Sequence, residues 1–263
     1  SVPAKDQSQE PRCMSEASPL AGKWALVTGA GRRVGAAIAR TLHEQGAGVA
    51  IHYRGSAADA AALAARLNST RPGSALTIQA DLHDTSKLGD LVAAVIRHAG
   101  RLDILVNNAS SFYPTPLAGI NEEQWSDLLG TNLKAPLFLA QAALPHLKAT
   151  QGVIINIVDI HAIRPLKDHT MYGAAKAGLA FLTRALARDL APDIRVNGVA
   201  PGAILWPEGG VSDQMRDVVL KQIPLKRVGE PSDIAACVLY LVRDAHYVTG
   251  QIIAVDGGRS VGW

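Results

Sequence analysis

Two side chains in the segment Tyr-Gly-Ala-Ala-Lys-Ala-Gly could form a proton-donating pair. Tyr172 and Lys176 stand four positions apart, so a helix would place both on one face. An ammonium group beside a phenol favours the phenolate, and we therefore expect Lys176 to lower the pKa of Tyr172. Tyr172 would then donate a proton near neutral pH, while Lys176 can also hold the ribose of a nicotinamide nucleotide. Such pairs are common by chance, so this interpretation depends on the motifs around them.

A carboxylate precedes this pair, because Asp159 stands thirteen positions before the tyrosine. An ionised carboxylate only accepts hydrogen bonds and repels a developing alkoxide, which disfavours the reduction of ordinary ketones. It suits instead a substrate in which hydride adds to the carbon of a C=N bond and the nitrogen gains a proton. The alternatives are that Asp159 is structural or that the site is inactive.

A glycine-rich turn follows the first apolar run of the chain. Residues 28–35 read Thr-Gly-Ala-Gly-Arg-Arg-Val-Gly and lead into a helical pattern. Gly29 permits a tight turn, Gly35 allows close packing of the helix on the sheet, and the helix N-terminus offers N–H groups to a diphosphate. A glycine turn alone is a weak signal, but a strand before it and a helix after it favour a dinucleotide site. The expected cofactor contacts are Gly29, Arg32, Arg33, Val34 and Gly35.

The end of the second apolar run selects between the two nicotinamide cofactors. An NAD site would place Asp or Glu there, to accept from the ribose hydroxyls. Residues 51–56 read Ile-His-Tyr-Arg-Gly-Ser and contain no acid. Arg54 and Ser56 can instead bind a 2′-phosphate, helped by Arg32 and Arg33, because arginine forms strong charge-assisted hydrogen bonds with phosphate. The alternative is a solvated basic loop. We predict NADPH, and therefore reduction.

Polar residues also follow the third and fourth apolar runs. Asp81 is placed to accept from the adenine amino group with Leu82 packing beside it, although an aspartate here could simply cap the next turn. Asn108 and Ala109 end the fourth run, where a cofactor would cross it. Asparagine at a strand end often only stabilises a turn, but within this βαβ pattern we expect both residues to line the cofactor.

Apolar runs and amphipathic segments alternate from residue 24 onwards. The expected strands are Trp24–Thr28, Gly48–Tyr53, Ala75–Ala80, Ile104–Asn107, Val153–Val158, Arg195–Ala200 and Gln251–Val255, and the expected helices cover 34–46, 57–69, 84–99, 121–149, 171–191 and 231–243. The strands are apolar along their length, which is typical of strands covered on both faces. The rhythm predicts one doubly wound α/β Rossmann-type domain over residues 21–263, with seven parallel strands and helices on both faces, after a disordered tail at 1–20. Ligands bind such sheets at the carboxyl ends of the strands.

Composition excludes several classes of protein. The chain has 263 residues, 48% of them hydrophobic and 19% charged, and a net charge of +3 with dispersed basic residues, so we expect no nucleic-acid partner. No run approaches the roughly 18 apolar residues that a membrane span requires. Cys13 and Cys237 lie far apart and show no metal-ligand spacing. We therefore expect no metal, no disulfide and a reducing, cytoplasmic location.

Together these motifs resemble the short-chain dehydrogenase/reductase family over nearly all of residues 20–263. The resemblance rests on the turn at 28–35, Asn-Asn-Ala at 107–109, Asn132, the Tyr-x-x-x-Lys motif at 172–176, and Pro201 with Gly202. It implies that Asn132 holds a water in a proton relay through Lys176. It also implies that Pro201 and Gly202 border the nicotinamide and that the protein forms a homotetramer.

Two departures from the family pattern are typical of its pteridine reductases. The family usually has a serine at the position of Asp159 and a third glycine at the position of Arg33. The segment Asn-Asn-Ala-Ser-Ser-Phe-Tyr-Pro-Thr-Pro-Leu at 107–117 closely resembles the corresponding segment of those enzymes. The resemblance extends to the cofactor residues His52, Tyr53 and Ser56.

The pteridine reductase resemblance also implies a substrate pocket. A flat pterin would stack between Phe112 and the nicotinamide, because an aromatic face is a good partner for a planar heterocycle. Ser110 would bind the ligand or a cofactor phosphate, and Arg33 would reach the polar edge of the pterin beside Asp159 and Tyr172. We expect Trp206 either to cover the pterin or to pack at a subunit interface.

The sequence thus predicts an NADPH-dependent pteridine reductase. Hydride would go to C6 of a dihydropterin or to C7 of a fully oxidised pterin. Dihydrobiopterin, dihydrofolate and dihydromonapterin remain open as substrates. The alternatives are a carbonyl reductase, for example of 3-oxoacyl thioesters, and a non-catalytic NADPH-binding sensor.

Overall fold

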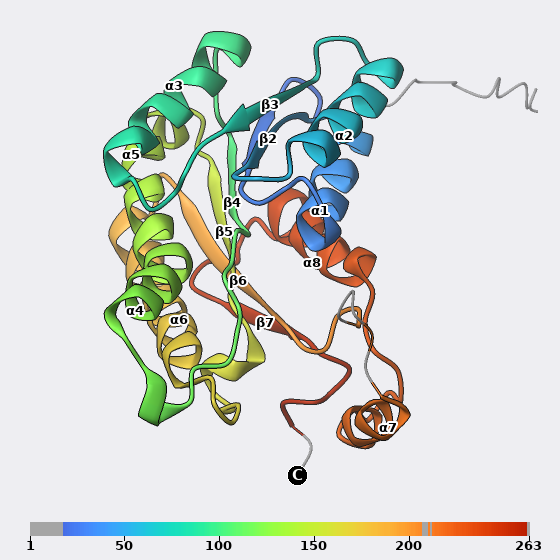
Figure 1. Ribbon diagram of the computed structural model, residues 1–263. Coiled ribbons are helices and arrows are strands. Elements are labelled where there is room, and N and C mark those ends of the chain that lie inside the picture. The colour runs from blue at the N-terminus through green and yellow to red at the C-terminus, as the bar shows by residue number, and fades with distance from the viewer. Residues whose placement is uncertain (1–17, 207–209, 211, 262–263) are drawn as a thin grey trace, which may run out of the picture.

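Seven parallel strands form one sheet in the order β3-β2-β1-β4-β5-β6-β7, in a computed structural model that describes residues 18–206, 210 and 212–261 (Figure 1). The strands are β1 (Trp24–Val27), β2 (Gly48–Tyr53), β3 (Ala75–Gln79), β4 (Ile104–Asn107), β5 (Val153–Ile157), β6 (Arg195–Pro201) and β7 (Ile252–Val255). The order reverses between β1 and β4, where a doubly wound sheet opens its ligand crevice. The predicted fold class is confirmed.

Helices cover both faces of this sheet (Figure 1). They are α1 (Arg33–Glu44), α2 (Ala57–Thr70), α3 (Leu88–Ala99), α4 (Glu122–Leu129), α5 (Ala135–Ala149), α6 (Thr170–Leu190), α7 (Asp213–Lys221) and α8 (Pro231–Arg243). One core lies between the sheet and α1, α2 and α8, and a second lies between the sheet and α3, α5 and α6. Among the described residues, no helix combines the length and the apolar character that crossing a bilayer would need.

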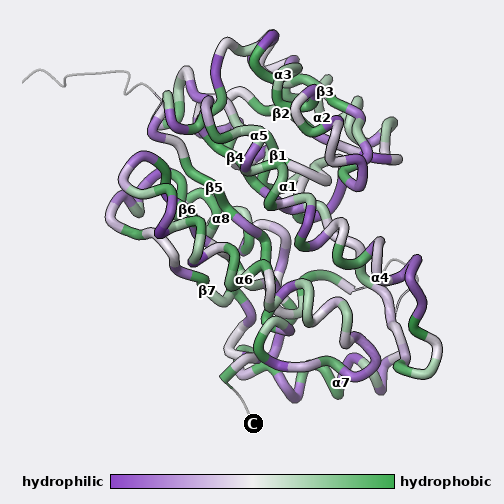
Figure 2. The backbone as a smooth tube through the Cα atoms, turned by 90° about the vertical axis from the view of Figure 1, so that its left-hand side faces the viewer, coloured by the Kyte–Doolittle hydropathy of each residue, from purple (hydrophilic) through white to green (hydrophobic). Residues whose placement is uncertain are grey.

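The inner strands of the sheet are apolar on both sides because both of their sides are buried. In β1, Ala25 and Val27 pack into the first core while Leu26 packs into the second. In β5, Ile155 belongs to the first core and Ile154 to the second. Figure 2 shows the same continuity, with hydrophobic residues along the strands and polar residues mainly in the outer turns. This burial explains why the sequence shows no alternation in these runs.

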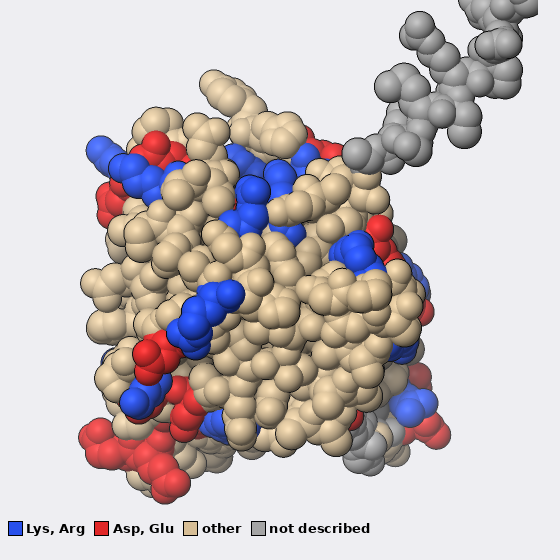
Figure 3. Space-filling model, turned by 90° about the horizontal axis from the view of Figure 1, so that it is seen from above, with Lys and Arg blue, Asp and Glu red and all other residues tan. Residues whose placement is uncertain are grey.

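Charged residues of both signs are scattered over the face of the molecule seen in Figure 3. On the face seen in Figure 3, lysine and arginine stand in separate groups, several of them beside acidic residues. The positive side chains that bear on function lie in the cavity described below.

The structure departs from the predicted elements at three places. The helix expected over 121–149 is divided by a π-helical segment, η3 (Gly130–Lys134). The short helix α7 was not predicted, and none of its residues is buried. Leu20, the last residue of the predicted tail, is buried, and its N–H donates to the carbonyl of Gln45 at 2.8 Å. Residues 1–17 of that tail lie outside the described residues.

Candidate active site

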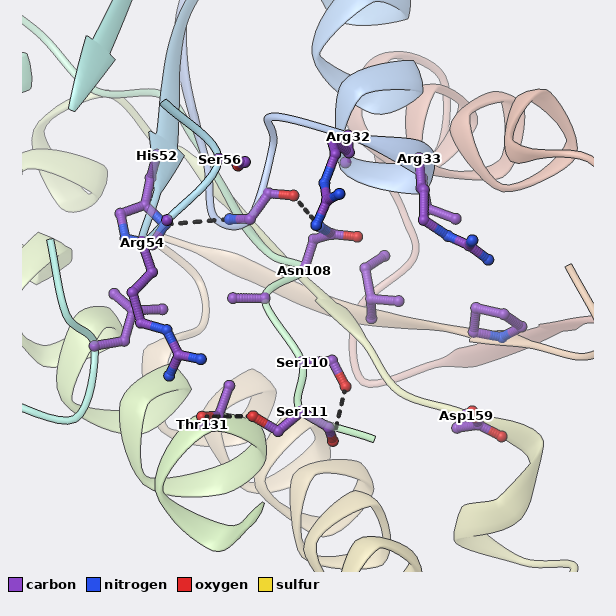
Figure 4. A pocket seen from close by; sticks show the side chains of 18 of the residues that line it. Arg32, Arg33, His52, Arg54, Ser56, Asn108, Ser110, Ser111, Thr131 and Asp159 are labelled. Atoms are coloured by element: carbon purple, nitrogen blue, oxygen red, sulfur yellow. Dashed lines mark hydrogen bonds between the residues drawn. The ribbon is translucent and has the colours of Figure 1, made fainter. Parts of the chain in front are cut away.

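A cavity of about 640 Å³ opens at the carboxyl ends of the strands (Figure 4). The predicted site residues that line it are Gly29, Arg32, Arg33, Val34, Gly35, His52, Arg54, Ser56, Asp81, Leu82, Asn108, Ala109, Ser110, Asp159, Tyr172, Lys176 and Pro201. Gly55, His83, Ser111, Thr131, Ile157 and Val158 also line it, although the sequence singled out none of them. One cavity therefore brings together the predicted cofactor residues and the predicted proton-donating pair.

The glycine turn after β1 is held by hydrogen bonds from neighbouring strands. Gly29 has φ +61°, and a Cβ on it would lie 3.0 Å from the Cα of Ala109. Its N–H donates to Nδ1 of His52 at 3.1 Å, and its carbonyl accepts from the amide of Asn108 at 3.1 Å. A Cβ on Gly35 would lie 2.3 Å from the carbonyl oxygen of Gly29. Both glycines therefore meet the packing needs that the sequence predicted.

The ring of His52 supports this turn from the side of β2. The histidine is 1% exposed, and its Nε2 lies 3.1 Å from the carbonyl of Ala80. Because Nδ1 accepts from Gly29, the proton of the neutral ring belongs on Nε2, which donates to Ala80. Burial lowers the pKa of His52, which keeps the ring neutral. We therefore assign His52 a supporting role beneath the cofactor cradle in addition to its place in the cavity wall.

Helix α1 begins with an unusual residue. Arg33, the first residue of α1, has φ +53°, in the left-handed region that favours glycine. The preceding Arg32 does not cap the helix with its side chain. At the neighbouring Gly31, a Cβ would lie 2.4 Å from Oγ of Ser56. Gly31 thus allows the loop after β2 to approach the turn, a role that the sequence did not reveal.

Three arginine side chains reach the cavity from two loops (Figure 4). Arg32 and Arg33 come from the start of α1, and Arg54 comes from the end of β2. Nη1 of Arg54 lies 4.0 Å from a carboxylate oxygen of Asp127, and the arginine side chain is 62% exposed. Such exposed ion pairs contribute only about 0–1 kcal/mol. Arg54 could therefore exchange this contact for a phosphate at little cost.

Asp81 stabilises a turn at the edge of the cavity. Its Oδ1 accepts from the N–H of His83 at 3.0 Å. The His83 ring lies 3.1 Å from Asp127 Oδ1 and 2.9 Å from Thr131 Oγ1. The turn-stabilising alternative for Asp81 is therefore realised, while its place in the cavity wall leaves the adenine contact as a prediction.

The carboxylate and the phenol of the proton-donating pair are in direct contact. The hydroxyl of Tyr172 donates to Oδ2 of Asp159 at 2.8 Å. The other carboxylate oxygen accepts from the N–H of His161 at 2.8 Å, which fixes Asp159 at the start of the short helix η4 (Ile160–Ala162). Burial, followed by the charge of Asp159 and its hydrogen bond, raises the pKa of Tyr172. This corrects the predicted lowering of that pKa, because a carboxylate rather than an ammonium faces the hydroxyl.

The ammonium group of Lys176 lies beneath the tyrosine ring. It is 2% exposed, donates to the carbonyl of Ile157 at 2.9 Å, and stands 5.7 Å from the centre of the Tyr172 ring. Burial lowers the pKa of Lys176 to about 8, against the opposing charge of Asp159. The lysine is therefore mainly protonated at neutral pH and presents its charge to the face of the phenol.

Asn132 lies in the π-helical segment and connects it to the loop after β4. Its amide nitrogen donates to the carbonyls of Ser111 and Leu128, both at 2.9 Å, and its oxygen accepts from Oγ of Ser110 at 2.7 Å. Asn132 is 1% exposed and does not line the cavity. π-Helical turns occur frequently at functional sites. Here the turn brings Asn132 to the loop that carries Ser110, and the water relay stays a prediction.

Phe112 forms an aromatic cluster with Tyr172 and His169. It is 55% exposed, its ring meets Tyr172 edge-on at 4.8 Å, and it stacks on His169 at 4.7 Å with an interplanar angle of 20°. Stacking of a pterin on Phe112 stays a prediction, and the sequence gave His169 no role. The exposed area of the phenylalanine provides a flat apolar surface next to the proton-donating pair.

Five predicted site residues do not line the cavity: Tyr53, Phe112, Asn132, Gly202 and Trp206. Tyr53 packs against the first core. A Cβ on Gly202 would lie 2.6 Å from Cβ of Asp256, so this glycine allows β6 and β7 to converge. The ring of Trp206 lies 5.6 Å from the guanidinium of Arg216 on α7. The predicted contacts of Tyr53, Gly202 and Trp206 with cofactor or substrate stay predictions.

A family model described as enoyl-(acyl carrier protein) reductase matches residues 29–260. The chain therefore belongs to the short-chain dehydrogenase/reductase family, in agreement with the resemblance of its motifs. As a member of this family it is an oxidoreductase that uses a nicotinamide cofactor.

Individual relatives agree on the family and differ in the substrates they are named for. The chain is 39% identical to pteridine reductase 1 of Leishmania tarentolae, over 90% of this chain and 96% of the relative. It is 40% identical to the 3-oxoacyl-(acyl-carrier-protein) reductase FabG of Staphylococcus epidermidis, over 90% and 98%. An uncharacterized oxidoreductase of Methylorubrum extorquens is 36% identical, over 92% and 99%. Sequence identity alone therefore does not distinguish between these substrates. The distinction has to come from the chemistry of the site.

Proposed function

We propose that this protein is an NADPH-dependent pteridine reductase that acts on a C=N bond of dihydropterins. The observation that carries the proposal is the 2.8 Å hydrogen bond from the Tyr172 hydroxyl to Asp159. A carboxylate at this position would repel the negative charge that develops on a carbonyl oxygen during ketone reduction. It would attract an N–H group of a pteridine ring instead.

The cavity has the donor set that NADPH requires. The start of α1 and the turn at Gly29 suit a diphosphate, and Arg54 with Ser56 suits a 2′-phosphate in a loop without an acid. The cofactor, when bound, would supply hydride to the substrate. Lys176, buried beneath the tyrosine, would hold the nicotinamide ribose and orient the reacting ring.

Proton delivery would begin from the contact between tyrosine and aspartate. A pteridine N–H that donates to Oδ2 of Asp159 would take the place of the phenol at that oxygen. The hydroxyl of Tyr172 would then be free to donate to the ring nitrogen next to the carbon that accepts hydride. The ammonium of Lys176 would stabilise the phenolate that results. The C=N bond thereby becomes CH–NH, and the cofactor is oxidised.

Phe112, Ser110 and Arg33 would hold the ring in place. The exposed face of Phe112 offers stacking to a planar heterocycle. Ser110 and the guanidinium of Arg33 both reach the cavity and would bind the polar edge of the pterin or a cofactor phosphate. The homotetramer and the cytoplasmic location stay predictions.

A carbonyl reductase is the second candidate, because the chain is 40% identical to a 3-oxoacyl-(acyl-carrier-protein) reductase. That function would require a hydrogen-bond donor toward the carbonyl oxygen. Tyr172 can donate, but Asp159 stands beside it as an acceptor. We therefore rank pteridine reduction first.

The decisive experiment compares NADPH oxidation with dihydrobiopterin, dihydrofolate and acetoacetyl thioester in the wild type, Asp159→Ser and Asp159→Asn. We expect the wild type to prefer the pteridines. Both substitutions should lower kcat/KM for pteridines about a hundredfold, since general acid–base groups contribute ~10²–10⁴. The Asn variant keeps the shape of the side chain and isolates its charge.

Faster turnover of acetoacetyl thioester by the wild type would establish the carbonyl reductase instead. NADPH binding without oxidation of any substrate in the panel would indicate a sensor. Pteridine rates that stay unchanged in both variants would remove the role given to Asp159.

A further inference from the structure

A second cavity, of about 400 Å³, is lined in part by the residues that follow Asp159 in the chain. Its lining consists of Ile160, His161, Arg164, Pro165, Leu166, Gln222 and Arg259. Asp159 lines the first cavity and Ile160, the next residue in the chain, lines the second. The charge of Asp159 also acts on Arg259 in the lining of the second cavity, so the two cavities lie close together.

The lining of the second cavity is positively charged. Its seven residues include two arginines and no carboxylate. Arg259 comes from the turn after β7, and Arg164 comes from the segment after η4, so the fold brings together two chain segments far apart in sequence. Arg164 donates to the carbonyl of Arg259, which ties these segments to each other.

Arg259 is held by a neutral partner. Its Nε and Nη2 donate to Oε1 of Gln222 at 3.3 and 2.9 Å. Among the described residues, no carboxylate lies within 4.0 Å of its guanidinium. Asp159 and Asp256 attract it from a greater distance, whereas Arg164 repels it. Asp256 is itself engaged by the N–H groups of the turn that follows it.

A half-buried guanidinium without a carboxylate partner is costly, and an anion would offset that cost. Burial lowers the pKa of Arg259, which is the physical sign of this partial desolvation. The amide of Gln222 points its oxygen at Arg259, which leaves the amide nitrogen as a donor. The ring of His161 lies with Nδ1 2.8 Å from the carbonyl of Arg164. The cavity therefore offers donors to a negatively charged group.

We propose that the second cavity binds an anionic side chain carried by the substrate, with Arg259 and Gln222 as the receiving groups. This inference rests on the proposed pteridine reductase function and restricts the substrates to pteridines with an acidic side chain. The ring would lie at Asp159 and Phe112, and a carboxylate or phosphate on its side chain would reach Arg259. The preferred substrate class is then a pteridine with an acidic tail, such as a folate with its glutamate, rather than a pterin with a neutral side chain.

The test measures KM and kcat of NADPH oxidation for dihydrofolate, dihydroneopterin phosphate and dihydrobiopterin. The variants are Arg259→Gln, Arg259→Lys and Gln222→Glu, and Arg66→Gln on the exposed surface of α2 is the matched control. Arg259→Gln should raise KM for the anionic substrates about tenfold, since a hydrogen bond to a charged group contributes roughly that much. The same variant should leave kcat and the KM of dihydrobiopterin within about twofold.

Arg259→Lys should restore part of the loss, and Gln222→Glu should reproduce it, because the new carboxylate pairs with Arg259 and repels the ligand. The three substrates also distinguish the two kinds of anion. A KM change for dihydrofolate alone would indicate that the cavity binds a carboxylate, and a change for the phosphate ester alone would indicate that it binds a phosphate. Equal changes for all three substrates, or none, would overturn the inference while leaving pteridine reduction intact.

Equilibrium binding of folate and biopterin to the NADP⁺-loaded protein gives a readout that does not depend on turnover. Weaker folate binding in Arg259→Gln, with biopterin binding unchanged, would support the anion site. If no pteridine is reduced but this difference in binding remains, the proposed reaction fails and the anion site stands. If folate binding is also unaffected, both fail.

Discussion

The cofactor end and the substrate end of the cavity are built in different ways. At the cofactor end, backbone groups of the Gly29 turn are held by His52 and Asn108, and close approaches leave room only for glycine at Gly35. At the substrate end, the geometry depends on side chains, with Tyr172 against Asp159. In the function proposed above, backbone packing forms the nucleotide site, and a few exchangeable side chains select the substrate. A family that shares a cofactor can in this way act on different substrates.

The largest effect is expected when the proposed proton donor, Tyr172, is removed. Tyr172→Phe should lower kcat with pteridines by ~10²–10⁴, the range for the loss of general acid catalysis. Binding of NADPH should change little, because the cofactor end keeps its backbone contacts. Single-turnover kinetics and fluorescence titration with NADPH measure the two effects separately. A loss of NADPH affinity as large as the loss in rate would show that the two ends are not independent.

The cofactor end can be probed through its exposed arginine. Arg54→Ala should raise KM for NADPH about tenfold to a hundredfold, because it removes charge-assisted hydrogen bonds to the 2′-phosphate. KM for NADH, which lacks that phosphate, should stay within about twofold. Arg66→Ala, an exposed arginine on α2, is the control. Parallel changes for both cofactors would place Arg54 outside the 2′-phosphate site.

The aromatic wall is expected to have a smaller effect. Phe112→Ala should raise KM for dihydrobiopterin about tenfold, since aromatic stacking contributes ~0.5–1.5 kcal/mol beyond the buried area. His169→Ala, which removes the ring stacked on Phe112, should raise the same KM about threefold, and His169→Phe should restore it. Tyr247→Ala at a fully exposed aromatic residue is the control. If His169→Ala lowers kcat and leaves KM unchanged, His169 acts on the reaction rather than on the wall.

The smallest expected effect is on pH dependence. The pKa of Lys176 is lowered from 10.5 to about 8, so its charge is lost as the pH rises through about 8. The phenolate then loses its stabilising partner, and kcat at saturating substrate should fall several-fold above that pH. Between about 8 and 10.5 the unfolded chain binds more protons than the folded one, so this lysine's contribution to stability should rise with pH. A kcat profile that stays flat to 10.5 would contradict the assignment.

The sequence was sufficient to predict the structure at positions where the backbone requires a particular residue type. Gly29 and Gly35 stand where a side chain would collide with a neighbouring strand or turn, so the motif itself carries the geometry. The strands were recognisable because both of their faces are buried. The proton-donating residues were found from their spacing along β5 and α6, although the direction of the pKa shift of Tyr172 depends on the orientation of the hydroxyl toward Asp159.

The sequence was insufficient to predict contacts between distant segments of the chain, or elements that bury few residues. The π-helical turn at 130–134 was missed because an extra residue in a turn leaves no distinct mark in composition. Helix α7 is only nine residues long and buries no residue, so its pattern is too short to distinguish it from a loop. The stacking of Phe112 on His169 and the cavity around Arg259 arise only when loops from different strands meet.

Arg33 has a left-handed backbone conformation. This conformation favours glycine, whereas the proposed ligand contacts require the arginine side chain. A non-glycine residue in this region costs ~1 kcal/mol or more, and glycine would relieve that strain. Glycine would also remove a guanidinium that lines the cavity, where we propose that it binds the diphosphate or the polar edge of the pterin. Selection for thermal stability alone would therefore favour glycine at position 33. The resulting protein would be more stable but would bind its ligands more weakly.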